Sequence, residues 1–283
     1  VEPGRMLEGR LIDAALACPQ INDRQSSFPG RLATRVFASD AVVAKLRTDL
    51  ALPKADPLRW IEARVARERE LAVYPPERTW FLVPTDDGQR HAGTASLRRR
   101  PMHLWDAGEW DAAWARWSVD FTDLYLGAAA LGWRLDEGPS NFAWDDASGD
   151  AALRYLDDDL YPWDHGMALR MALGVTARRQ AWLGAGHGIV FARALRQALQ
   201  CAPAALNVRE FANDLAADGE TLPFLSALAH ELADWRRPAP ARAAAPRLAV
   251  LADVHANLDA LEAPDVGVAA QPVAQHLFQH RLV

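Results

Sequence analysis

The chain has 283 residues, of which half are apolar and 24% are charged, and this ordinary globular composition excludes a disordered, collagen-like or disulfide-scaffold protein. A net charge of −6 does not suit nucleic-acid binding, and the two cysteines, Cys18 and Cys201, are too few for a disulfide framework or a metal site. The low cysteine count indicates a reducing, cytoplasmic compartment, and no apolar run is long enough to span a bilayer, so we expect neither nucleic acid nor membrane as a partner.

The first third of the chain is predicted to be rich in strands, after an N-terminal extension over 1–30. Apolar runs bounded by turn residues predict strands at 32–37, 41–46, 79–83 and 92–97, with a turn at 86–88 before the last. The first two runs flank a Ser-Asp turn and predict a hairpin. A stretch without Gly or Pro predicts a helix over 58–73. These elements define a β-rich part over 31–100.

The next part, 101–235, is predicted to be mainly helical. Apolar residues recur at alternating spacings of four and three at Trp110, Trp114, Trp117, Phe121, Leu124, Ala128 and Leu131. This spacing predicts one apolar face of a long helix, whose tryptophans belong to the core and form no platform for a cofactor. After two strand-like runs at 142–144 and 153–156, helical patterns resume over 166–235.

The composition of the chain changes again near its end. Pro, Ala and Arg dominate 236–246, which is typical of a linker. Beyond it, 247–253 is predicted to be a buried strand, and a helix begins over 258–263. The order of elements therefore predicts an α+β protein with a two-lobed body and a separate short strand–helix tail over 247–283.

Polar residues of a few chemical types follow the predicted elements in a defined order. Lys45 lies near the end of a strand, Asp136 and Asn141 stand five residues apart across a Gly-Pro turn, and Asp157-Asp158-Asp159 follow a strand-like run. This order resembles the protein-kinase-like phosphotransferases, in particular their aminoglycoside- and small-molecule-kinase branch. The resemblance implies a β-rich N-lobe and a helical C-lobe with ATP bound between them.

The resemblance also implies roles for individual residues. It places the catalytic aspartate at Asp136, one magnesium ligand at Asn141, and the second at Asp157 with Asp158 as its close competitor. Lys45 would hold the nucleotide phosphates. Phosphoryl transfer requires these chemical types, because a carboxylate orients the accepting hydroxyl, hard oxygens bind Mg²⁺ and a cation neutralises the phosphates. ATP and Mg²⁺ are the implied cofactors, and the implied partners are a nucleotide and an unknown phosphate acceptor.

The lysine of this family needs a carboxylate partner on the helix that follows it. Glu62 lies at the more family-like distance from Lys45, whereas Glu68 falls on an apolar stripe of the predicted helix, where a charge needs a partner. The sequence leaves this choice open.

The sequence also departs from the pattern of the family. Arg134-Leu135 stands where a histidine or arginine normally precedes the catalytic aspartate, and the Phe-Gly pair after the metal aspartate is absent. The glycine triplet over the phosphates is missing, and only Ser26–Gly30 lies near its place. These departures keep open a second hypothesis, a pseudokinase scaffold that binds a nucleotide or a partner without turnover.

The tail carries a separate motif. Residues 248–263, LAVLADVHANLDALEA, resemble the opening of calcineurin-like metallophosphoesterases, and the resemblance places two metal ligands at Asp253 and His255. A complete domain would use Mn²⁺ or another divalent pair to activate water. Because the family pattern stops after Ala263, we expect a truncated fragment without phosphoesterase turnover, as an incomplete reading frame would leave. A third hypothesis is that the parent protein is a phosphoesterase and that the large domain is a regulatory or substrate-binding module.

Overall fold

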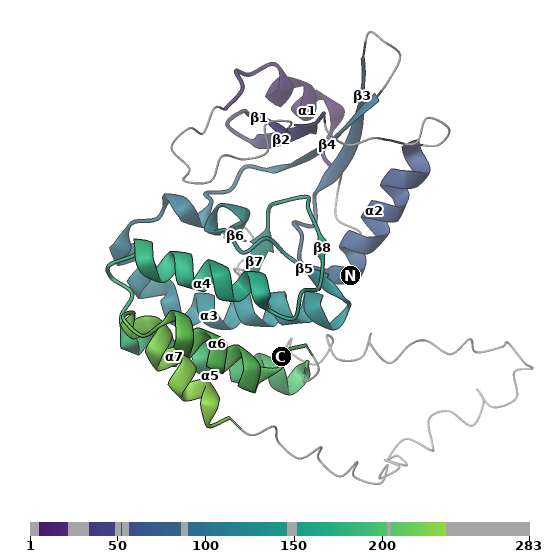
Figure 1. Cartoon of the computed structure of the whole chain (residues 1–283). Helices are drawn as coiled ribbons and strands as arrows, with labels where there is room; N and C mark the ends of the chain where they lie inside the picture. The colour runs from purple at the N-terminus through teal and green to yellow at the C-terminus, as the bar shows by residue number, and fades with distance from the viewer. Residues whose placement is uncertain are drawn as a thin grey trace, which may run out of the picture. The chain divides into compact units, whose positions relative to one another are not determined.

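The computed structural model describes residues 6–21, 34–48, 52, 57–85, 90–145, 152–202 and 205–235. Several sequence predictions lie outside the described residues: Ser26–Gly30, the turn at 86–88, the linker 236–246, the strand 247–253, the helix 258–263, Asp253 and His255. The described residues form a mixed α+β protein with antiparallel sheets and helices (Figure 1).

A four-stranded antiparallel sheet lies in the N-terminal part, in the order β1-β2-β4-β3. Its strands are β1 (Thr34–Ala38), β2 (Val42–Arg47), β3 (Thr79–Pro84) and β4 (Arg90–Leu97). The predicted hairpin is β1–β2, and Ser39 Oγ accepts the Val42 N–H in its turn, at 3.1 Å. Lys45 lies opposite Thr94 of β4. The sheet therefore presents Lys45 from one of its inner strands.

Two helices accompany this sheet (Figure 1). Helix α1 (Gly9–Leu16) packs on it through a small core of Ile12, Ala15, Val42, Ala44 and Ala95. Helix α2 (Pro57–Leu71) matches the predicted helix but ends two residues earlier, because Ala72 takes a left-handed conformation with φ of 53°. The turn after α2 then leads directly into β3.

Helix α3 (Ala107–Ala130) is the long helix that the tryptophan spacing predicts. It begins with a capping box, in which Asp106 and Glu109 each accept the other's backbone N–H. The predicted face is buried at Trp110, Trp114, Trp117, Phe121 and Ala128. The prediction is wrong for Leu131, which is 37% exposed, because the helix ends at Ala130 and Leu131 caps it.

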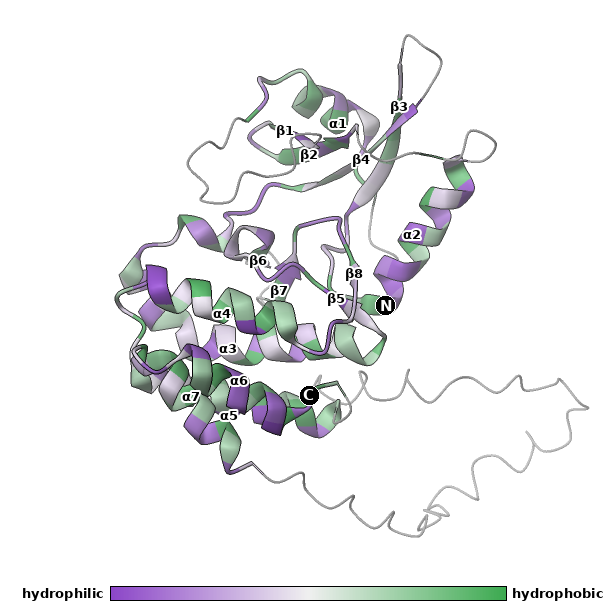
Figure 2. Cartoon of the chain, viewed as in Figure 1, coloured by the Kyte–Doolittle hydropathy of each residue, from purple (hydrophilic) through white to green (hydrophobic). Residues whose placement is uncertain are grey.

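The predicted helical stretch 166–235 contains four helices among the described residues. They are α4 (Met167–Arg179), α5 (Ala185–Cys201), α6 (Val208–Asp218) and α7 (Pro223–Ala233). Together with α3 they enclose one large apolar core, and each shows hydrophobic and hydrophilic bands in Figure 2. Gly188 lets α5 approach α7 closely, since a Cβ there would lie 2.2 Å from the Phe224 carbonyl oxygen. None of the described helices combines the length and the apolar character that crossing a membrane requires.

Short strands connect the helices to the loops that carry the predicted site. The predicted runs 142–144 and 153–156 form the hairpin β6 (Phe142–Asp145) and β7 (Ala152–Tyr155), preceded by the short 3-10 helix η2 (Pro139–Asn141). A second pair, β5 (Trp133–Arg134) with β8 (Tyr161–Pro162), has no signal in the sequence because each strand is only two residues long. A further 3-10 turn, η1 (Met102–Leu104), precedes α3. The paired strands fix both ends of the loops 135–141 and 156–160.

We predict that Trp117→Ala destabilises the protein strongly. Trp117 is 8% exposed and stacks on Phe121 at 4.7 Å between ring centroids, so its loss leaves a cavity in the core. Urea unfolding should show a loss of about 3–5 kcal/mol in the free energy of unfolding. Met171→Ala on α4 is the control, because Met171 is 59% exposed and its loss should cost less than about 0.5 kcal/mol. Equal stability of the two variants would contradict the position of Trp117 in the core.

Candidate functional site

The loop between β5 and β6 brings Asp136 and Asn141 together around Gly138. Asp136 Oδ1 accepts the Gly138 N–H at 3.0 Å. A Cβ on Gly138 would lie 3.2 Å from Asp136 Oδ1, 3.4 Å from Asn141 Nδ2 and 3.5 Å from Ser140 Oγ. A side chain at Gly138 would therefore press against Asp136 Oδ1 and be in ordinary contact with the other two groups. The loop gathers a carboxylate, an amide and a hydroxyl at one point.

This loop is bonded directly to the segment that follows β7. The Leu156 N–H donates to the Asn141 carbonyl oxygen at 2.7 Å. The Tyr155 hydroxyl accepts the Asp136 N–H and donates to the Asp159 carbonyl oxygen, both at 2.9 Å. The backbone of Asp136 and Asn141 is thus held against the segment that carries the three consecutive aspartates.

Lys45 of β2 reaches this segment from the sheet. Its Nζ lies 2.9 Å from Asp157 Oδ1 and 3.2 Å from the Leu156 carbonyl oxygen. Asp157 Oδ1 also accepts the Asp158 N–H at 2.9 Å. The Lys45 and Asp157 side chains are 19% and 18% exposed. The structure therefore brings Lys45 and Asp157 together. Asp157 directly follows Leu156, the residue that is bonded to Asn141.

Opposing effects act on the pKa of Asp157. Burial alone would raise this pKa, but the Lys45 ammonium and the hydrogen bonds from Lys45 and Asp158 outweigh burial. The pKa of Asp157 is therefore well below its usual value. Its carboxylate is charged at neutral pH and can act as an oxygen ligand.

Asp158 has a different environment from Asp157. Its Oδ2 lies 2.9 Å from Arg47 Nη1, and both side chains are only 1% exposed. Burial is the main effect on the pKa of Asp158 and, with the neighbouring Asp157 charge, raises it, although Lys45, Arg47 and Arg78 oppose the shift. Asp158 Oδ2 is thus enclosed with Arg47, whereas the Asp157 side chain is more exposed and lies beside Lys45.

The expectation that α2 supplies the partner of Lys45 is wrong in this structure. Glu62 is exposed on α2, and Lys45 pairs with Asp157. Glu68 is buried, but its Oε1 accepts Trp80 Nε1–H at 3.0 Å and lies 3.5 Å from Arg78 Nη1. Glu68 thus has other partners, while the segment after β7 lies within reach of Lys45.

Three arginines that the sequence patterns did not single out hold the segment 156–159. Arg47 Nη1 pairs with the carboxylates of Asp158 and Asp159. Arg64 Nη2 donates to the Asp158 carbonyl oxygen at 2.6 Å. Arg78 donates to the carbonyl oxygens of Leu156 and Asp157. Only Arg47 carries a usable signal, because it stands two residues after Lys45 and so shares a strand face with it. Nothing local distinguishes Arg64 and Arg78 from the other arginines.

The described residues contain no group of three or more His, Cys, Asp or Glu side chains placed to hold a metal ion.

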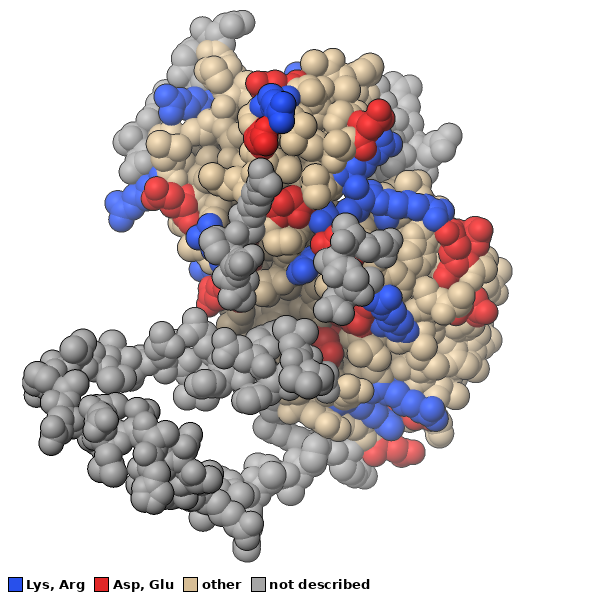
Figure 3. Space-filling view, turned by 180° about the vertical axis from the view of Figure 1, so that it is seen from behind, with Lys and Arg blue, Asp and Glu red and all other residues tan. Residues whose placement is uncertain are grey.

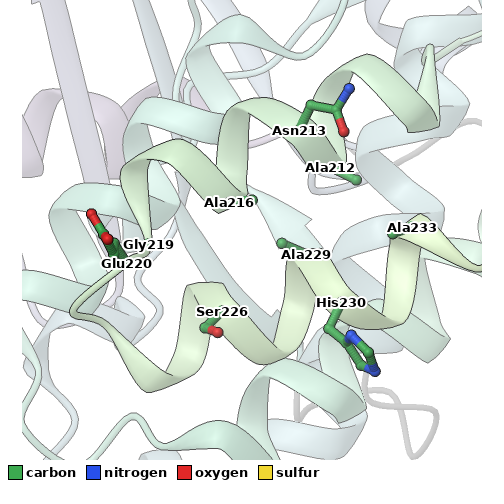
Figure 4. A pocket seen from close by; sticks show the side chains of 9 residues that line it. All are labelled: Ala212, Asn213, Ala216, Gly219, Glu220, Ser226, Ala229, His230 and Ala233. Carbon is green, nitrogen blue, oxygen red and sulfur yellow. The ribbon is translucent and has the colours of Figure 1, made fainter.

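A hollow of about 260 Å³ lies between α6 and α7 (Figure 4). It is lined by Ala212, Asn213, Ala216, Gly219, Glu220, Ser226, Ala229, His230 and Ala233, and none of these is a predicted site residue. Basic and acidic side chains are interspersed over the face shown in Figure 3.

No protein-family model matches the chain, and no curated protein matches its sequence. Among solved structures it is similar to WaaP in complex with acyl carrier protein, with a TM-score of 0.42 and 12% identity over 72% of this chain and 87% of that one. It is also similar to a crystal structure of WbdD, with a TM-score of 0.31 and 11% identity over 52% of this chain and 35% of that one. For WbdD with the kinase inhibitor LY294002, the TM-score is 0.32 and the identity 12%, over 62% and 42% of the two chains.

We predict that Lys45→Met lowers the free energy of unfolding more at neutral pH than at acidic pH. In the wild type the lowered pKa of Asp157 contributes stability at neutral pH, and this contribution is lost as the pH falls below about 4. Without Lys45 the carboxylate stays largely buried but unpaired. This should cost about 3–5 kcal/mol at neutral pH, toward the lower end because both side chains are partly exposed.

The difference between wild type and Lys45→Met should shrink as the pH falls. Burial without a cation raises the pKa of Asp157 above its unfolded value, so protonation relieves the variant first. Urea unfolding at about pH 7.5 and about pH 5 measures this difference. In a Lys45→Met/Asp157→Asn double variant the pH dependence of the difference should disappear. A difference that is the same at both pH values would contradict a raised pKa of Asp157 in the variant, and a difference near zero at both would show that the ion pair contributes nothing.

Proposed function

We propose that the chain is a kinase-like phosphotransferase, which binds ATP with Mg²⁺ and transfers a phosphoryl group to a hydroxyl of a small molecule or a protein. The observation that carries this proposal is the ion pair between Lys45 and Asp157, placed directly beside the loop of Asp136 and Asn141. A cation, two carboxylates and an amide are the groups that phosphoryl transfer requires.

The order of elements supports the same proposal. A strand with the lysine is followed by α2, two strands, the long helix α3, the loop of Asp136 and the β6–β7 hairpin that ends before Asp157. The sheet and α1 have a small apolar core of their own, separate from the large core around α3. We propose that these two parts are the N-lobe and the C-lobe, with the nucleotide between them.

The donor atoms of the site suit Mg²⁺. Lys45 Nζ and the Asp158 N–H both bind Asp157 through Oδ1, and among the described residues the side-chain amide of Asn141 has no hydrogen-bond partner. Both residues offer hard oxygen ligands, and Mg²⁺ commonly takes only one or two such protein ligands beside phosphate and water oxygens. When bound, Mg²⁺ would neutralise charge that develops on the phosphates.

The remaining roles follow from position. Lys45 would place its ammonium on the phosphates, since its contact with Asp157 puts that charge beside the metal ligand. Asp136 has one carboxylate oxygen occupied by the Gly138 N–H, so Oδ2 would orient the accepting hydroxyl and take its proton. The proton then stays on Asp136 until the product leaves.

Two other hypotheses remain predictions. The pseudokinase hypothesis keeps nucleotide binding without turnover, and the missing glycine triplet and the absence of an α2 carboxylate on Lys45 favour it. The phosphoesterase hypothesis rests on Asp253 and His255, which lie outside the described residues. A cytoplasmic location also stays a prediction.

We predict that Mg²⁺-dependent ATP binding requires Asp157. Calorimetry with and without Mg²⁺ should show tighter ATP binding in its presence, and Asp157→Asn should remove about tenfold or more of this gain by weakening the metal ligand. Asp136→Asn should retain binding but lower the rate of ADP formation by about 10²–10⁴-fold, because it loses the base. Asp13→Asn, at an exposed position of α1, is the control for the loss of one acidic charge.

Distinct results separate the hypotheses. Binding of ATP without any turnover would favour the pseudokinase. If Asp157→Asn binds ATP and Mg²⁺ as tightly as Asp13→Asn does, the proposed site is wrong. Hydrolysis of an aryl phosphate with Mn²⁺ that Asp253→Ala abolishes would instead favour the phosphoesterase.

A further inference from the structure

We propose that Arg78 is a positioning residue that holds Asp157 in place through the backbone, and that Glu68 of α2 in turn holds Arg78. The contacts themselves are independent of function, whereas the consequence for catalysis rests on the function proposed above. Through this pair, α2 would be coupled to the metal ligand without any contact between a glutamate and Lys45.

The guanidinium of Arg78 donates hydrogen bonds to two consecutive backbone carbonyl groups. Nη2 donates to the Leu156 carbonyl oxygen at 2.5 Å and Nη1 donates to the Asp157 carbonyl oxygen at 2.7 Å. The Arg78 side chain is only 3% exposed, and its Cζ lies 4.4 Å from the centre of the Tyr74 ring. A planar guanidinium presents its donors in a fixed geometry, so two bonds set both the position and the orientation of the segment.

The turn that carries Arg78 is itself fixed to the same segment. The Arg78 N–H donates to the Pro75 carbonyl oxygen at 3.1 Å, and β3 begins at the next residue. Upstream in this turn, the Val73 carbonyl oxygen accepts the Tyr155 N–H at 2.9 Å. The turn 73–78 therefore meets the chain at three consecutive residues, 155–157, and Arg78 provides two of the three contacts.

Glu68 connects this arrangement to α2. Its Oε1 lies 3.5 Å from Arg78 Nη1, and the same oxygen accepts Trp80 Nε1–H at 3.0 Å. The Glu68 and Arg78 side chains are 8% and 3% exposed, so the pair is shielded from water. A shielded carboxylate beside a guanidinium fixes its orientation more strongly than an exposed pair does.

The Leu156 carbonyl oxygen shows why the position of Asp157 depends on Arg78. This oxygen accepts both Lys45 Nζ and Arg78 Nη2. Without Arg78, Lys45 would be the remaining donor to it, and the Asp157 carbonyl oxygen would lose its bond. The segment could then move relative to β2, and Lys45 would no longer select one position of the Asp157 carboxylate.

Hydrogen exchange of the protein without nucleotide tests the positioning role. In Arg78→Met, amides of a peptide over 153–160 should exchange about tenfold faster or more, since two bonds to a charged donor are lost. Arg78→Lys, with a single point charge, should give an intermediate increase, and Glu68→Gln a smaller one in the same peptide. Arg98→Met is the matched control, because exposed Arg98 also donates to one carbonyl oxygen, that of Ser39.

A peptide from α5 reports whether any effect is global. If Arg78→Met does not fold, Arg78→Lys and Glu68→Gln carry the same measurement. An increase confined to 153–160 supports positioning, whereas unchanged exchange in 153–160, or an equal rise in α5, overturns it.

Mg²⁺ dependence provides the functional readout. Arg78→Lys should weaken the apparent affinity for Mg²⁺ in the presence of ATP by about fivefold or more, while ATP binding in a chelator stays within about twofold of wild type. If the wild type shows no Mg²⁺-dependent ATP binding, the proposed function fails while the exchange result still decides the positioning role. If the wild type binds ATP with Mg²⁺ but Arg78→Lys behaves like Arg98→Met in both assays, only the positioning role fails.

Discussion

The pairing of three consecutive, largely buried acidic residues, 157–159, is the constraint on which the arrangement of this protein depends. Lys45 and Arg47 of β2 pair with the carboxylates, while Arg64 and Arg78 donate to backbone carbonyl oxygens of the same segment. Carboxylates removed from water are destabilising unless cations and hydrogen bonds replace their hydration. The segment is therefore stable only where the sheet, α2 and the turn before β3 bring their basic side chains to one place.

A buried phenol connects this charged segment to the loop of Asp136. Tyr155 is fully buried, and its ring packs against Phe142 and Tyr74 at 5.4 and 5.6 Å between centroids. A buried hydroxyl needs hydrogen bonds, and here it takes one from the Asp136 N–H and gives one to the Asp159 carbonyl oxygen. The aromatic core thus fixes the ring, and the ring fixes the spacing of two polar loops.

A second charged contact joins the four-stranded sheet to the β6–β7 hairpin. Arg99, which follows β4, lies 2.6 Å from Glu77 Oε1 and 3.1 Å from Asp145 Oδ2 at the end of β6. Burial opposes the charged form of Arg99, but both acids outweigh this effect and raise its pKa. Glu77 and Arg78 are neighbours in the turn before β3. In this turn Glu77 therefore binds Arg99, which also binds Asp145 of β6, while Arg78 binds the segment after β7.

Local patterns in the sequence predicted most of the longer helices and strands, but not the two-residue strands β5 and β8. The spacing of the tryptophans predicted the buried face of α3, because a helix repeats its faces every 3.6 residues; Leu124 is only partly buried, and Leu131 is exposed where the helix ends. The order of Lys45, Asp136 and Asn141 was visible because each type is restricted in the chemistry it can perform.

The partners of these residues were decided only by the tertiary structure. Lys45 and Asp157 are 112 residues apart in the sequence, and Glu68 is buried on the helix that was expected to supply the carboxylate. Glu68 binds Trp80 and Arg78 instead. An ion pair depends on a separation of a few ångströms, which is set by the packing of strands and helices far apart in the chain and leaves no periodic signal in the sequence.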